Sequence, residues 1–378
     1  MRIAVNTRLL LPDKLEGIGW FAHETLSRIV RAHPEHRFLF LFDRAFDRRF
    51  LYADNVEGVV LWPPTRHPLL YRLWFDLRLP GALRRLKADA FLSPDGYLAL
   101  RSRVPTLAVI HDLNFEHHPE DLPKAYRAFY RGQFPRYARH ATRLATVSEH
   151  SRQDIARTYG IPADRIDVVY NGVGEVFRPL SVAEQEDARR TFSEGHPYLI
   201  CIGSLNPRKN IARLLEAFDT LADTGDTDLR LLIVGERMWW DGRMEQAWQG
   251  MRHRDRVLFT GRLDQQRLHR ALGGAMALAF VSYFEGFGIP VAEAMRCGVP
   301  VVAARATSLP EVAGDAAHYC DPFHVGDITR ALREVVADAA LRERLGRAGI
   351  ARSARFTWDG AATDLWASFE RMLKDAGR

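Results

Sequence analysis

The chain has 378 residues, of which 47% are hydrophobic and 26% are charged, and its formal net charge is +6. This composition is that of a globular protein of two or three domains, and no apolar run reaches the about 20 residues of a transmembrane helix. The first residues read as a buried strand rather than as an export signal, so we expect a cytoplasmic protein.

The cysteines and the charges exclude two further classes. Cys201, Cys297 and Cys320 lie far apart in apolar segments, which favours buried free thiols over disulfides or a zinc site. Residues 1–175 hold 26 basic and 20 acidic side chains and thus carry the whole excess of positive charge. No helix-turn-helix, zinc-finger or aromatic RNA-binding pattern accompanies this excess, so we predict no nucleic-acid partner.

Short β-rich runs alternate with helical stretches along the whole chain. The strands expected in the first half are Ile3–Thr7, Arg37–Phe42, Val59–Trp62, Ala90–Ser93, Thr106–His111, Leu144–Val147 and Val168–Tyr170. Those expected in the second half are Tyr198–Ile202, Leu231–Val234, Val257–Thr260, Leu278–Val281, Val301–Ala303 and His318–Tyr319. Short apolar runs of this kind suit strands that are buried on both faces of a parallel sheet. The alternation predicts an α/β protein with two Rossmann-like, doubly wound domains facing across a cleft.

The join between the two series is expected near residues 172–195, where glycines, Pro179 and a charged helix over Ser181–Arg190 separate them. We therefore predict an N-terminal domain at 1–175 and a C-terminal domain at 176–355. Residues 356–378 are expected to form a helix that crosses back to the first domain. Ligands of open parallel sheets bind at the carboxyl ends of the strands.

A glycine turn follows the strand expected at Tyr198–Ile202 and precedes a helix that begins at Ile211. Asn210 is expected to cap that helix, which would put Arg208 and Lys209 at a helix amino terminus. Backbone amides, the helix dipole and two cations favour an anion there, and we expect a diphosphate. The P-loop spacing is missing, and the alternative is that both cations are solvated surface charges.

A second glycine turn follows the strand expected at Leu278–Val281 and leads into a helix whose first turn holds Pro290. Glu285 lies on this turn and Glu293 on the helix. The two carboxylates could accept hydrogen bonds from two hydroxyl-bearing parts of one ligand, such as a sugar and a ribose. Two glutamates at this spacing are common by themselves, but the Gly-Phe-Gly-x-Pro insert between them makes the pattern specific.

Residues 285–302, EGFGIPVAEAMRCGVPVV, resemble the signature of glycosyltransferase family 4. Members of this family are retaining, nucleotide-sugar-dependent enzymes with the GT-B fold. Six further segments resemble other parts of the family pattern: Gly17–Gly19, His111–Leu113, Val147–Ser148, Asn171–Val173, Asn206–Asn210 and Ser308–Asp315. The similarity covers nearly the whole chain and is more specific in its second half.

The resemblance implies that the N-terminal domain binds the acceptor and that the C-terminal domain binds the nucleotide-sugar donor. It also implies that Arg208 and Lys209 hold the donor diphosphate and that Glu293 holds the nucleotide ribose. Glu285 would be catalytic and would hold the hydroxyls of the transferred sugar near the reacting carbon. The turn that follows it, Gly286, Phe287 and Gly288, would contribute its backbone amides. Many members carry an arginine where this chain has Ser204, so charge compensation would rest on the two cations alone.

Three further donor contacts are implied for glycines and an arginine on other turns: Gly17 and Gly203 near the diphosphate, and Arg262 near the base. His111 would be a second catalytic residue, which contacts the sugar from the N-terminal domain. Read without the family, this histidine closes a strand and either faces the ligand or is structural. His117 and His118 have no third ligand at usable spacing. Because family members generally work without a divalent ion, we expect neither a metal nor another cofactor.

The expected chemistry is the loss of a nucleoside diphosphate, with negative charge on the phosphate and positive charge on the sugar. The acceptor hydroxyl would attack from the face of the leaving group. We predict transfer of a hexose, with mannose and GDP-mannose favoured and a UDP- or dTDP-sugar as alternatives. The acceptor would be a glycan or a lipid-linked glycan of polysaccharide or lipopolysaccharide synthesis. Two other functions stay open: a nucleotide-sugar epimerase of the same fold, and a two-lobed sugar-binding protein without catalysis.

Residues 66–87 carry most of the positive excess, with six basic side chains, Arg66 among them, against Asp76. Leu70, Leu73, Trp74 and Leu77 keep helical spacing, so an apolar stripe is expected beside the cations. Such a helix could contact an anionic membrane surface or a lipid-linked acceptor. The residues assigned to this contact are Arg72, Trp74, Arg78, Arg84 and Arg85. The alternative is an amphipathic helix that packs on its own sheet and has a solvated basic face.

Overall fold

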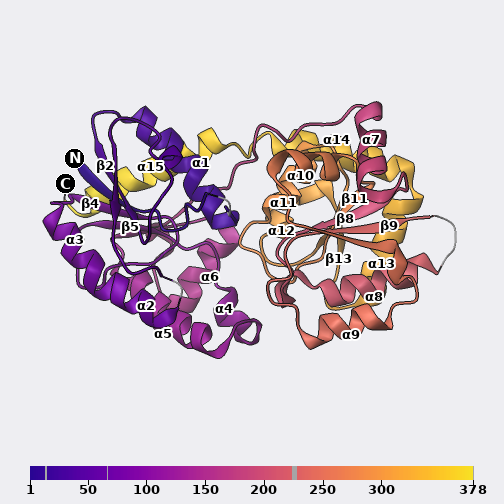
Figure 1. The fold of residues 1–378 in the computed structure, drawn as a ribbon, viewed down its shortest axis with the longest axis horizontal. Coiled ribbons are helices and arrows are strands. Elements are labelled where there is room, and N and C mark those ends of the chain that lie inside the picture. The colour runs from indigo at the N-terminus through magenta and orange to yellow at the C-terminus, as the bar shows by residue number, and fades with distance from the viewer. Residues whose placement is uncertain (13–14, 66, 224–227, 378) are drawn as a thin grey trace. The chain divides into compact units, whose positions relative to one another are not determined.

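The structure is a computed structural model that describes residues 1–12, 15–65, 67–223 and 228–377. Contacts divide the chain into two compact units. Unit 1 comprises Met1–Gly172 and Thr357–Arg378, and unit 2 comprises Val173–Phe356. Each unit is a parallel β-sheet with helices packed on it (Figure 1). The predicted α/β class with two Rossmann-like domains is therefore confirmed.

The sheet of unit 1 has the strand order β3-β2-β1-β4-β5-β6-β7, with every neighbouring pair parallel. Its strands are β1 (Arg2–Asn6), β2 (Arg37–Phe42), β3 (Val56–Val60), β4 (Ala90–Ser93), β5 (Thr106–Val109), β6 (Arg143–Thr146) and β7 (Ile166–Val168). Strands β1, β2, β4, β5 and β6 are almost wholly buried. Apolar residues at successive positions are therefore needed on both faces, as the continuous apolar runs predict.

Helices cover both faces of this sheet. They are α1 (Gly17–Ala32), α2 (Pro68–Arg72), α3 (Leu79–Arg85), α4 (Asn114–His117), α5 (Lys124–His140), α6 (Glu149–Tyr159) and α15 (Trp358–Asp375). A π-helical turn, η2 (Leu73–Arg78), joins α2 to α3. Single 3₁₀ turns are η1 (Arg48–Phe50), η3 (Pro119–Asp121) and η4 (Ala163–Arg165).

The sheet of unit 2 has the order β10-β9-β8-β11-β12-β13 and is also parallel throughout. Its strands are β8 (Tyr198–Ile202), β9 (Arg230–Val234), β10 (Val257–Gly261), β11 (Ala277–Phe280), β12 (Val301–Ala304) and β13 (Ala317–Cys320). Its helices are α7 (Val182–Ser193), α8 (Ile211–Ala222), α9 (Gly242–Gly250), α10 (Gln265–Gly273), α11 (Ile289–Arg296), α12 (Leu309–Ala313), α13 (Val325–Ala337) and α14 (Ala339–Ser353). The 3₁₀ turns are η5 (Pro207–Lys209), η6 (Arg254–Arg256) and η7 (Gly314–Ala316).

All thirteen expected strands are present, and two are displaced along the chain. Strand β3 begins three residues before the expected Val59, and β7 begins two residues before the expected Val168. Both lie at the edges of the unit 1 sheet, where exposure interrupts the apolar pattern that marks a buried strand. The charged helix expected at Ser181–Arg190 is α7, which Ser181 opens with a capping box.

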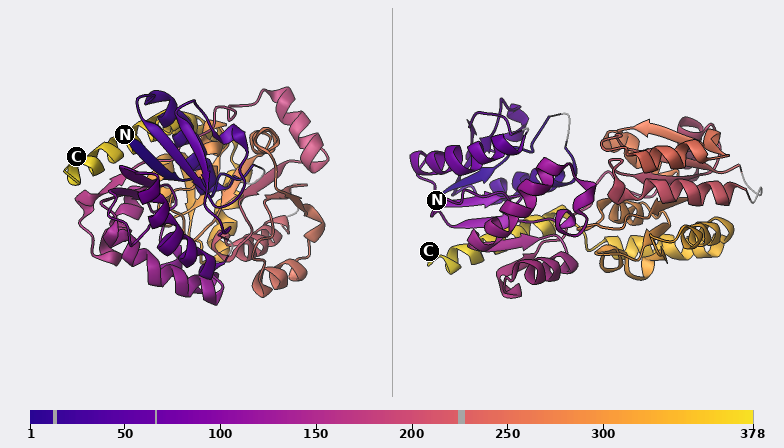
Figure 2. Two further views of the ribbon diagram at one scale, coloured as in Figure 1. Left: turned by 60° about the vertical axis from the view of Figure 1, so that its left-hand side comes forward. Right: turned by 90° about the horizontal axis from the view of Figure 1, so that it is seen from below.

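The last helix of the chain belongs to unit 1. Helix α15 packs against α1, and both termini of the chain lie in unit 1 (Figures 1 and 2). Two chain segments therefore connect the units, and they lie side by side. The Val173 amide donates a hydrogen bond to the Phe356 carbonyl at 3.2 Å. A Cβ atom on Gly172 would lie 2.3 Å from the amide nitrogen of Trp358.

Candidate active site

The carboxyl ends of neighbouring strands in unit 2 form the edge at which the predicted donor residues lie. The amide of Gly203, after β8, donates to the carbonyl of Val234 at 2.9 Å, and the amide of Gly235, after β9, donates to the carbonyl of Gly261 at 2.9 Å. These two bonds hold the turns after β8, β9 and β10 beside one another. Arg262 follows the last of these turns and is exposed.

Gly203 lets the side chain of Lys209 lie across the turn after β8. The φ of Gly203, +142°, is unfavourable for residues with a side chain. A Cβ atom there would also lie 2.7 Å from Lys209 Cε. Lys209 Nζ lies 4.6 Å from the ring centroid of Phe280. Burial lowers the pKa of Lys209, and the nearby carboxylate of Glu285 opposes that shift.

Arg208, Lys209 and Glu285 form one ion cluster. Arg208 Nη1 lies 2.9 Å from Glu285 Oε2, and Lys209 Nζ lies 2.6 Å from Glu285 Oε1. Burial alone would raise the pKa of Glu285, but the two cations outweigh burial and hold that pKa below its ordinary value. The structure thus brings together two predicted diphosphate ligands and a predicted catalytic residue, with two positive charges against one negative charge.

Two residues for which the sequence predicted no role, Thr307 and Ser308, fix the backbone of Glu285. Its amide donates to Thr307 Oγ1 at 2.9 Å, and Ser308 Oγ donates to its carbonyl at 2.9 Å. The same hydroxyl lies 3.2 Å from the carbonyl of Phe287. Ser308 opens one of the family-like segments, but nothing in that segment indicates that it pairs with a residue 23 positions earlier.

The turn after Glu285 has the backbone expected of a ligand-binding loop. Gly288 has a φ of +97°, and a Cβ atom there would lie 2.7 Å from Leu309 Cδ2. The ring of Phe287 packs edge-on against Phe356, with 5.3 Å between ring centroids. Phe287 could therefore meet a donor only through its backbone, as could Gly286. Helix α11 begins directly after this turn, so its first amides point toward the same edge.

The carboxyl group of Glu293 has no hydrogen bond to any of the residues that the structure describes. It lies in the second turn of α11, and burial raises its pKa to about 8. A carboxyl group in this state lacks the donors that would stabilise its charge. Hydroxyl groups of a bound ribose would supply such donors, so the geometry is compatible with the predicted role, which stays a prediction.

Asn210 does not cap α8 with its side chain, contrary to the prediction. Its backbone is in the left-handed region, at φ +59°. Its side-chain amide instead donates to the carbonyls of Val281, at 3.0 Å, and Pro322, at 2.6 Å. Through these two hydrogen bonds Asn210 connects the turn that carries Arg208 and Lys209 to the turns after β11 and β13.

Two site residues, His111 and Gly17, are predicted in the N-terminal domain. They lie at the edge of unit 1 where its strands have their carboxyl ends. His111 follows β5, and its Nε2 lies 2.8 Å from the carbonyl of Pro94. Burial lowers the pKa of His111, so the ring is neutral, with the proton on Nε2 and Nδ1 left as an acceptor. Gly17 opens α1, and a Cβ atom there would meet none of the described residues within 4 Å. The described part of the chain therefore shows no steric need for this glycine.

The basic segment of unit 1 differs from the prediction at Trp74. This tryptophan is fully buried, and its indole Nε1 donates to the carbonyl of Leu61 at 2.6 Å. It cannot contact an acceptor or a membrane, because the core of unit 1 encloses it. Four of the arginines assigned to that contact are exposed: Arg72, Arg78, Arg84 and Arg85. Arg66 lies outside the described residues.

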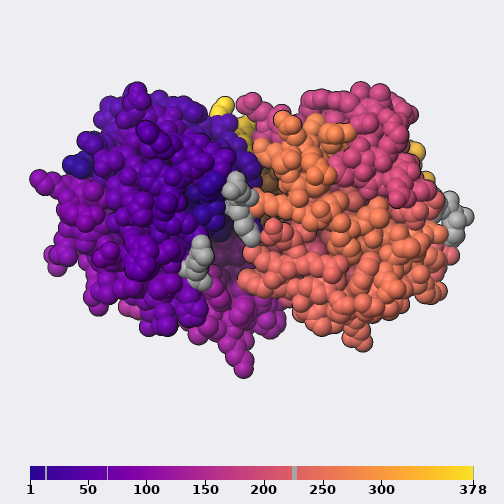
Figure 3. Space-filling model, in the orientation of Figure 1, coloured from indigo at the N-terminus to yellow at the C-terminus, as the bar shows by residue number. Residues whose placement is uncertain are grey.

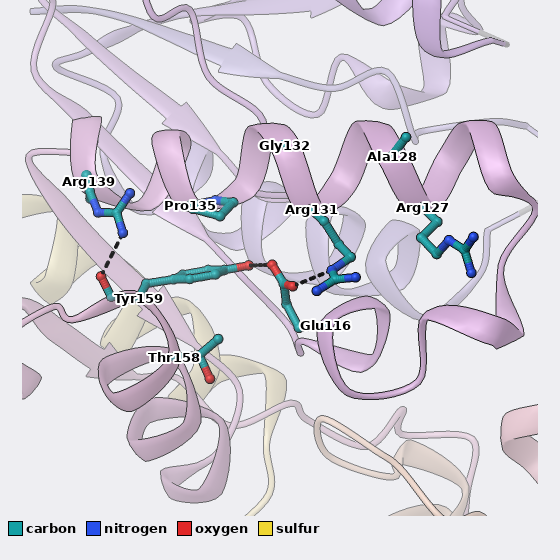
Figure 4. Close-up of a pocket in the computed structure, with 9 residues that line it drawn as sticks. All are labelled: Glu116, Arg127, Ala128, Arg131, Gly132, Pro135, Arg139, Thr158 and Tyr159. Carbon is teal, nitrogen blue, oxygen red and sulfur yellow. Dashed lines mark hydrogen bonds and ion pairs between the residues drawn. The ribbon is translucent and has the colours of Figure 1, made fainter.

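Unit 1 also contains a hollow of about 540 Å³ between α5 and α6 (Figure 4). Glu116 is one of its lining residues and accepts from the hydroxyl of Tyr159 at 3.1 Å and from Arg131 Nε at 3.0 Å. Arg139 donates to the carbonyl of Tyr159 at 3.4 Å. None of the predicted site residues lines this hollow, and the carboxylate of Glu116 already accepts two hydrogen bonds.

The cysteines and histidines outside the site have structural surroundings. Cys201, Cys297 and Cys320 are buried and free, which confirms the expected thiols. His117 Nε2 lies 2.8 Å from Asp154 Oδ1. Across the described residues, no three His, Cys, Asp or Glu side chains are grouped as metal ligands, and no helix combines the length and apolarity of a membrane span.

Two family models match the chain in succession. Glycosyltransferase Family 4 matches residues 15–175, and Glycosyl transferases group 1 matches residues 182–352. The O-antigen chain mannosyltransferase B of Escherichia coli is 30% identical over 360 residues, which cover 92% of this chain and 94% of that protein. The MMP alpha-(1->4)-mannosyltransferase of Mycolicibacterium hassiacum is 30% identical over 244 residues, 63% of this chain and 56% of that protein.

Solved structures share the fold at low sequence identity. The sucrose-phosphate synthase of Thermosynechococcus elongatus has a TM-score of 0.77 at 17% identity, over 99% of both chains. Anabaena Alr3699/HepE, in complex with UDP and glucose, has a TM-score of 0.76 at 18% identity, over 98% of this chain and 99% of that chain.

Proposed function

The chain belongs to the group 1 and family 4 glycosyltransferases, and we propose that it transfers mannose from GDP-mannose to a glycan hydroxyl with retention of configuration. The acceptor is a glycan or lipid-linked glycan, and the enzyme works at the cytoplasmic face of a membrane. Mannosyltransferases among the relatives, two of them named for the O-antigen, support this choice of sugar and product.

The observation that carries the proposal is the ion cluster of Arg208, Lys209 and Glu285. Its two cations exceed its one carboxylate, and they pair with Glu285, four residues before α11 begins. A donor diphosphate is the anion that this excess suits. It can also be drawn to the backbone amides of the turn after Glu285. A sugar on that diphosphate would come next to the Glu285 carboxylate, which is held ionised and can accept hydroxyl hydrogen bonds.

The reaction that follows from these parts is a displacement at the anomeric carbon on one face. The bond from that carbon to the phosphate oxygen breaks, and the oxygen carries away the electron pair. The acceptor oxygen forms the new bond from the same face, and its proton passes to the departing phosphate oxygen. Arg208 and Lys209 stabilise the charge that develops on the phosphate. No protein nucleophile is needed, and the configuration is retained.

Charge compensation by these two cations is also the basis for proposing that no metal ion takes part. Lys209 has little freedom to move, since Gly203 and Phe280 enclose it. A fixed cation beside the leaving group does electrostatically what a divalent ion does in other transferases. The position of Ser204 adds no third cation, so the loss of either side chain should be costly.

The first experiment measures the thermal stability of the protein with GDP, UDP, dTDP or ADP. We expect GDP to raise the melting temperature most. Lys209→Met should weaken GDP binding about 10- to 100-fold, which is the value of a charge-assisted hydrogen bond to phosphate. Lys374→Met, an exposed lysine of α15, is the control and should bind GDP normally. Preference for another base would refute GDP-mannose as the donor.

A second experiment follows the products. GDP-mannose is incubated with and without a dye-labelled mannoside, and the products are identified by NMR. Retention predicts an α-linked product from the α-linked donor, and a β-linked product would refute it. Formation of an epimer of the intact donor without an acceptor would favour the epimerase alternative. Full activity in excess chelator is expected, and a requirement for an added divalent ion would contradict the metal-free proposal.

A further inference from the structure

The hollow between α5 and α6 is bordered by one row of residues on α5. Arg127, Arg131, Pro135 and Arg139 recur at every fourth position of this helix, and all four line the hollow. Residues at this spacing lie on one face of an α-helix. We call Arg127, Arg131 and Arg139 the arginine row, and their side chains point to the same side of α5 in Figure 4. The magenta-purple part of the chain, which contains α5, forms the lower surface of unit 1 in Figure 3.

Small residues beside the arginine row leave room for a ligand. Ala128 and Gly132 also line the hollow, and a Cβ atom on Gly132 would meet none of the described residues within 4 Å. The volume of the hollow, about 540 Å³, lies within the range of about 300–1,000 Å³ that is typical of small-molecule sites. The hollow can therefore accept a molecule that is larger than a single inorganic ion.

The charge of the hollow is positive and only partly compensated. Helix α5 carries five lysine and arginine side chains and no carboxylate. Among the described residues that line the hollow, Glu116 supplies the one carboxylate, and it pairs with Arg131 at 3.0 Å. Like charges four positions apart destabilise a helix, so a row of three arginines is unfavourable without an anion. The excess of two positive charges matches a phosphomonoester, which carries about −1.5 to −2 at pH 7.

The arginine row also has hydrogen-bond donors to spare. The guanidinium of Arg127 forms no hydrogen bond or ion pair with any residue that the structure describes. Arg131 uses Nε to bind Glu116, and Arg139 uses Nη2 to bind the carbonyl of Tyr159 at 3.4 Å. Each guanidinium has five N–H donors, so most of them remain available. Their paired geometry matches the oxygens of a phosphate group.

The rest of the lining suits hydroxyl groups better than a base or an acyl chain. The carboxylate of Glu116 can accept hydrogen bonds, and so can the hydroxyl of Thr158, which itself donates to Asp154 Oδ1 at 3.2 Å. Among the lining residues that the structure describes, the one aromatic ring is that of Tyr159, which is 3% exposed and offers no face for stacking. The apolar lining is limited to small residues, so the occupant should be polar.

We propose that this hollow binds a small sugar phosphate. The phosphate group lies against the arginine row, and the sugar hydroxyls face Glu116 and Thr158. The hollow is separate from the predicted diphosphate ligands, because it lies in unit 1 and they lie in unit 2. Glu116 belongs to α4, which begins three residues after His111, so an occupant adjoins the segment that follows this histidine. The inference goes beyond the proposed function and does not depend on it.

The test is calorimetric titration of the full chain with mannose 6-phosphate, in a buffer of low ionic strength that contains no phosphate. We expect saturable binding with a Kd of about 1 mM or tighter. Mannose should not bind the hollow, and inorganic phosphate should bind at least about tenfold more weakly, since it forms none of the hydroxyl contacts. Binding should weaken as ionic strength rises, because salt screens the attraction of the arginine row.

Variants of α5 locate the binding. Arg127→Gln should weaken it about tenfold, and Arg127→Gln with Arg139→Gln about 100-fold, as expected for charge-assisted hydrogen bonds. Gly132→Phe should block the hollow while it keeps every charge. Arg136→Gln is the matched control, because this arginine is an exposed residue of the same helix that does not line the hollow. It should bind mannose 6-phosphate normally, and so should Lys209→Met, whose change lies in unit 2.

Three outcomes would overturn the inference. The first is the absence of saturable binding to the wild type. The second is binding that Lys209→Met abolishes and the arginine variants leave intact, which would assign the ligand to unit 2. The third is equal affinity for inorganic phosphate, which would identify a simple anion site. Stabilisation by GDP is measured on the same samples, and its loss would count against the proposed function alone.

Discussion

The raised pKa of Glu293 predicts a stability that depends on pH in an unusual direction. In the folded chain its carboxyl has a pKa of about 8, against 4.5 for an unperturbed glutamate. Between these values the folded state binds more protons than the unfolded state, so stability falls as pH rises. Each pKa unit corresponds to about 1.4 kcal/mol, and the loss from pH 5 to pH 8 is about 3 kcal/mol. Glu293→Gln removes this dependence.

The assay is thermal unfolding of the wild type and Glu293→Gln at pH 5 and pH 8. The melting temperature of the variant relative to the wild type should rise by about 6–12 °C across this interval, as expected for a unit of this size. Glu186→Gln, at an exposed carboxyl of α7, should show no such change. GDP should stabilise the wild type more strongly at pH 8, because ribose hydroxyls favour the ionised carboxylate. A difference between variant and wild type that is the same at both pH values would refute this reasoning.

Three further predictions concern single side chains. Gly203→Ala should weaken GDP binding at least about tenfold, since the added Cβ would displace Lys209. Calorimetric titration with GDP checks this. Gly250→Ala, at a glycine with open space around it, is the control and should bind GDP normally. Trp74→Ala should destabilise the chain by about 3–5 kcal/mol in urea unfolding, as for other buried aromatic residues. The exposed Leu77→Ala should change the same free energy by less than about 1 kcal/mol, and equal losses at the two sites would contradict their opposite placement.

The strand pattern could be predicted because burial on both faces leaves a strong local signal. Strands β3 and β7 lie at the edges of the sheet, where this signal is interrupted, and both begin earlier in the chain than the sequence predicts. In residues 66–87 the helical spacing predicts an apolar stripe beside the cations. The prediction that Trp74 contacts an acceptor or a membrane is wrong, because this side chain faces the core. Two short α-helices, α2 and α3, flank the π-helical turn η2, and the change in residues per turn shifts which side faces the core. A single helical period cannot describe them.

For the candidate site, the sequence predicts the cations and the carboxylates but not their pairing. Glu285 lies 76 positions from Lys209, and the contact arises only because β8 and β11 are neighbours in the sheet. Asn210 shows the same limit. The local sequence predicts that Asn210 caps a helix, but its side-chain amide donates to two carbonyls on other loops. Long-range hydrogen-bond partners of this kind follow from the sheet order, which no local pattern contains.

The paired segments that connect the units give the chain the topology of a domain insertion. Unit 2 is one continuous stretch whose two ends are hydrogen-bonded to each other, at Val173 and Phe356. Unit 1 is interrupted by it and resumes with α15. Unit 2 can therefore be excised as a single piece, whereas cutting the chain at residue 172 would deprive unit 1 of a helix of its own core. Because Gly172 lies against Trp358, a short peptide link at that point would rejoin unit 1 into a chain that could be expressed and studied by itself.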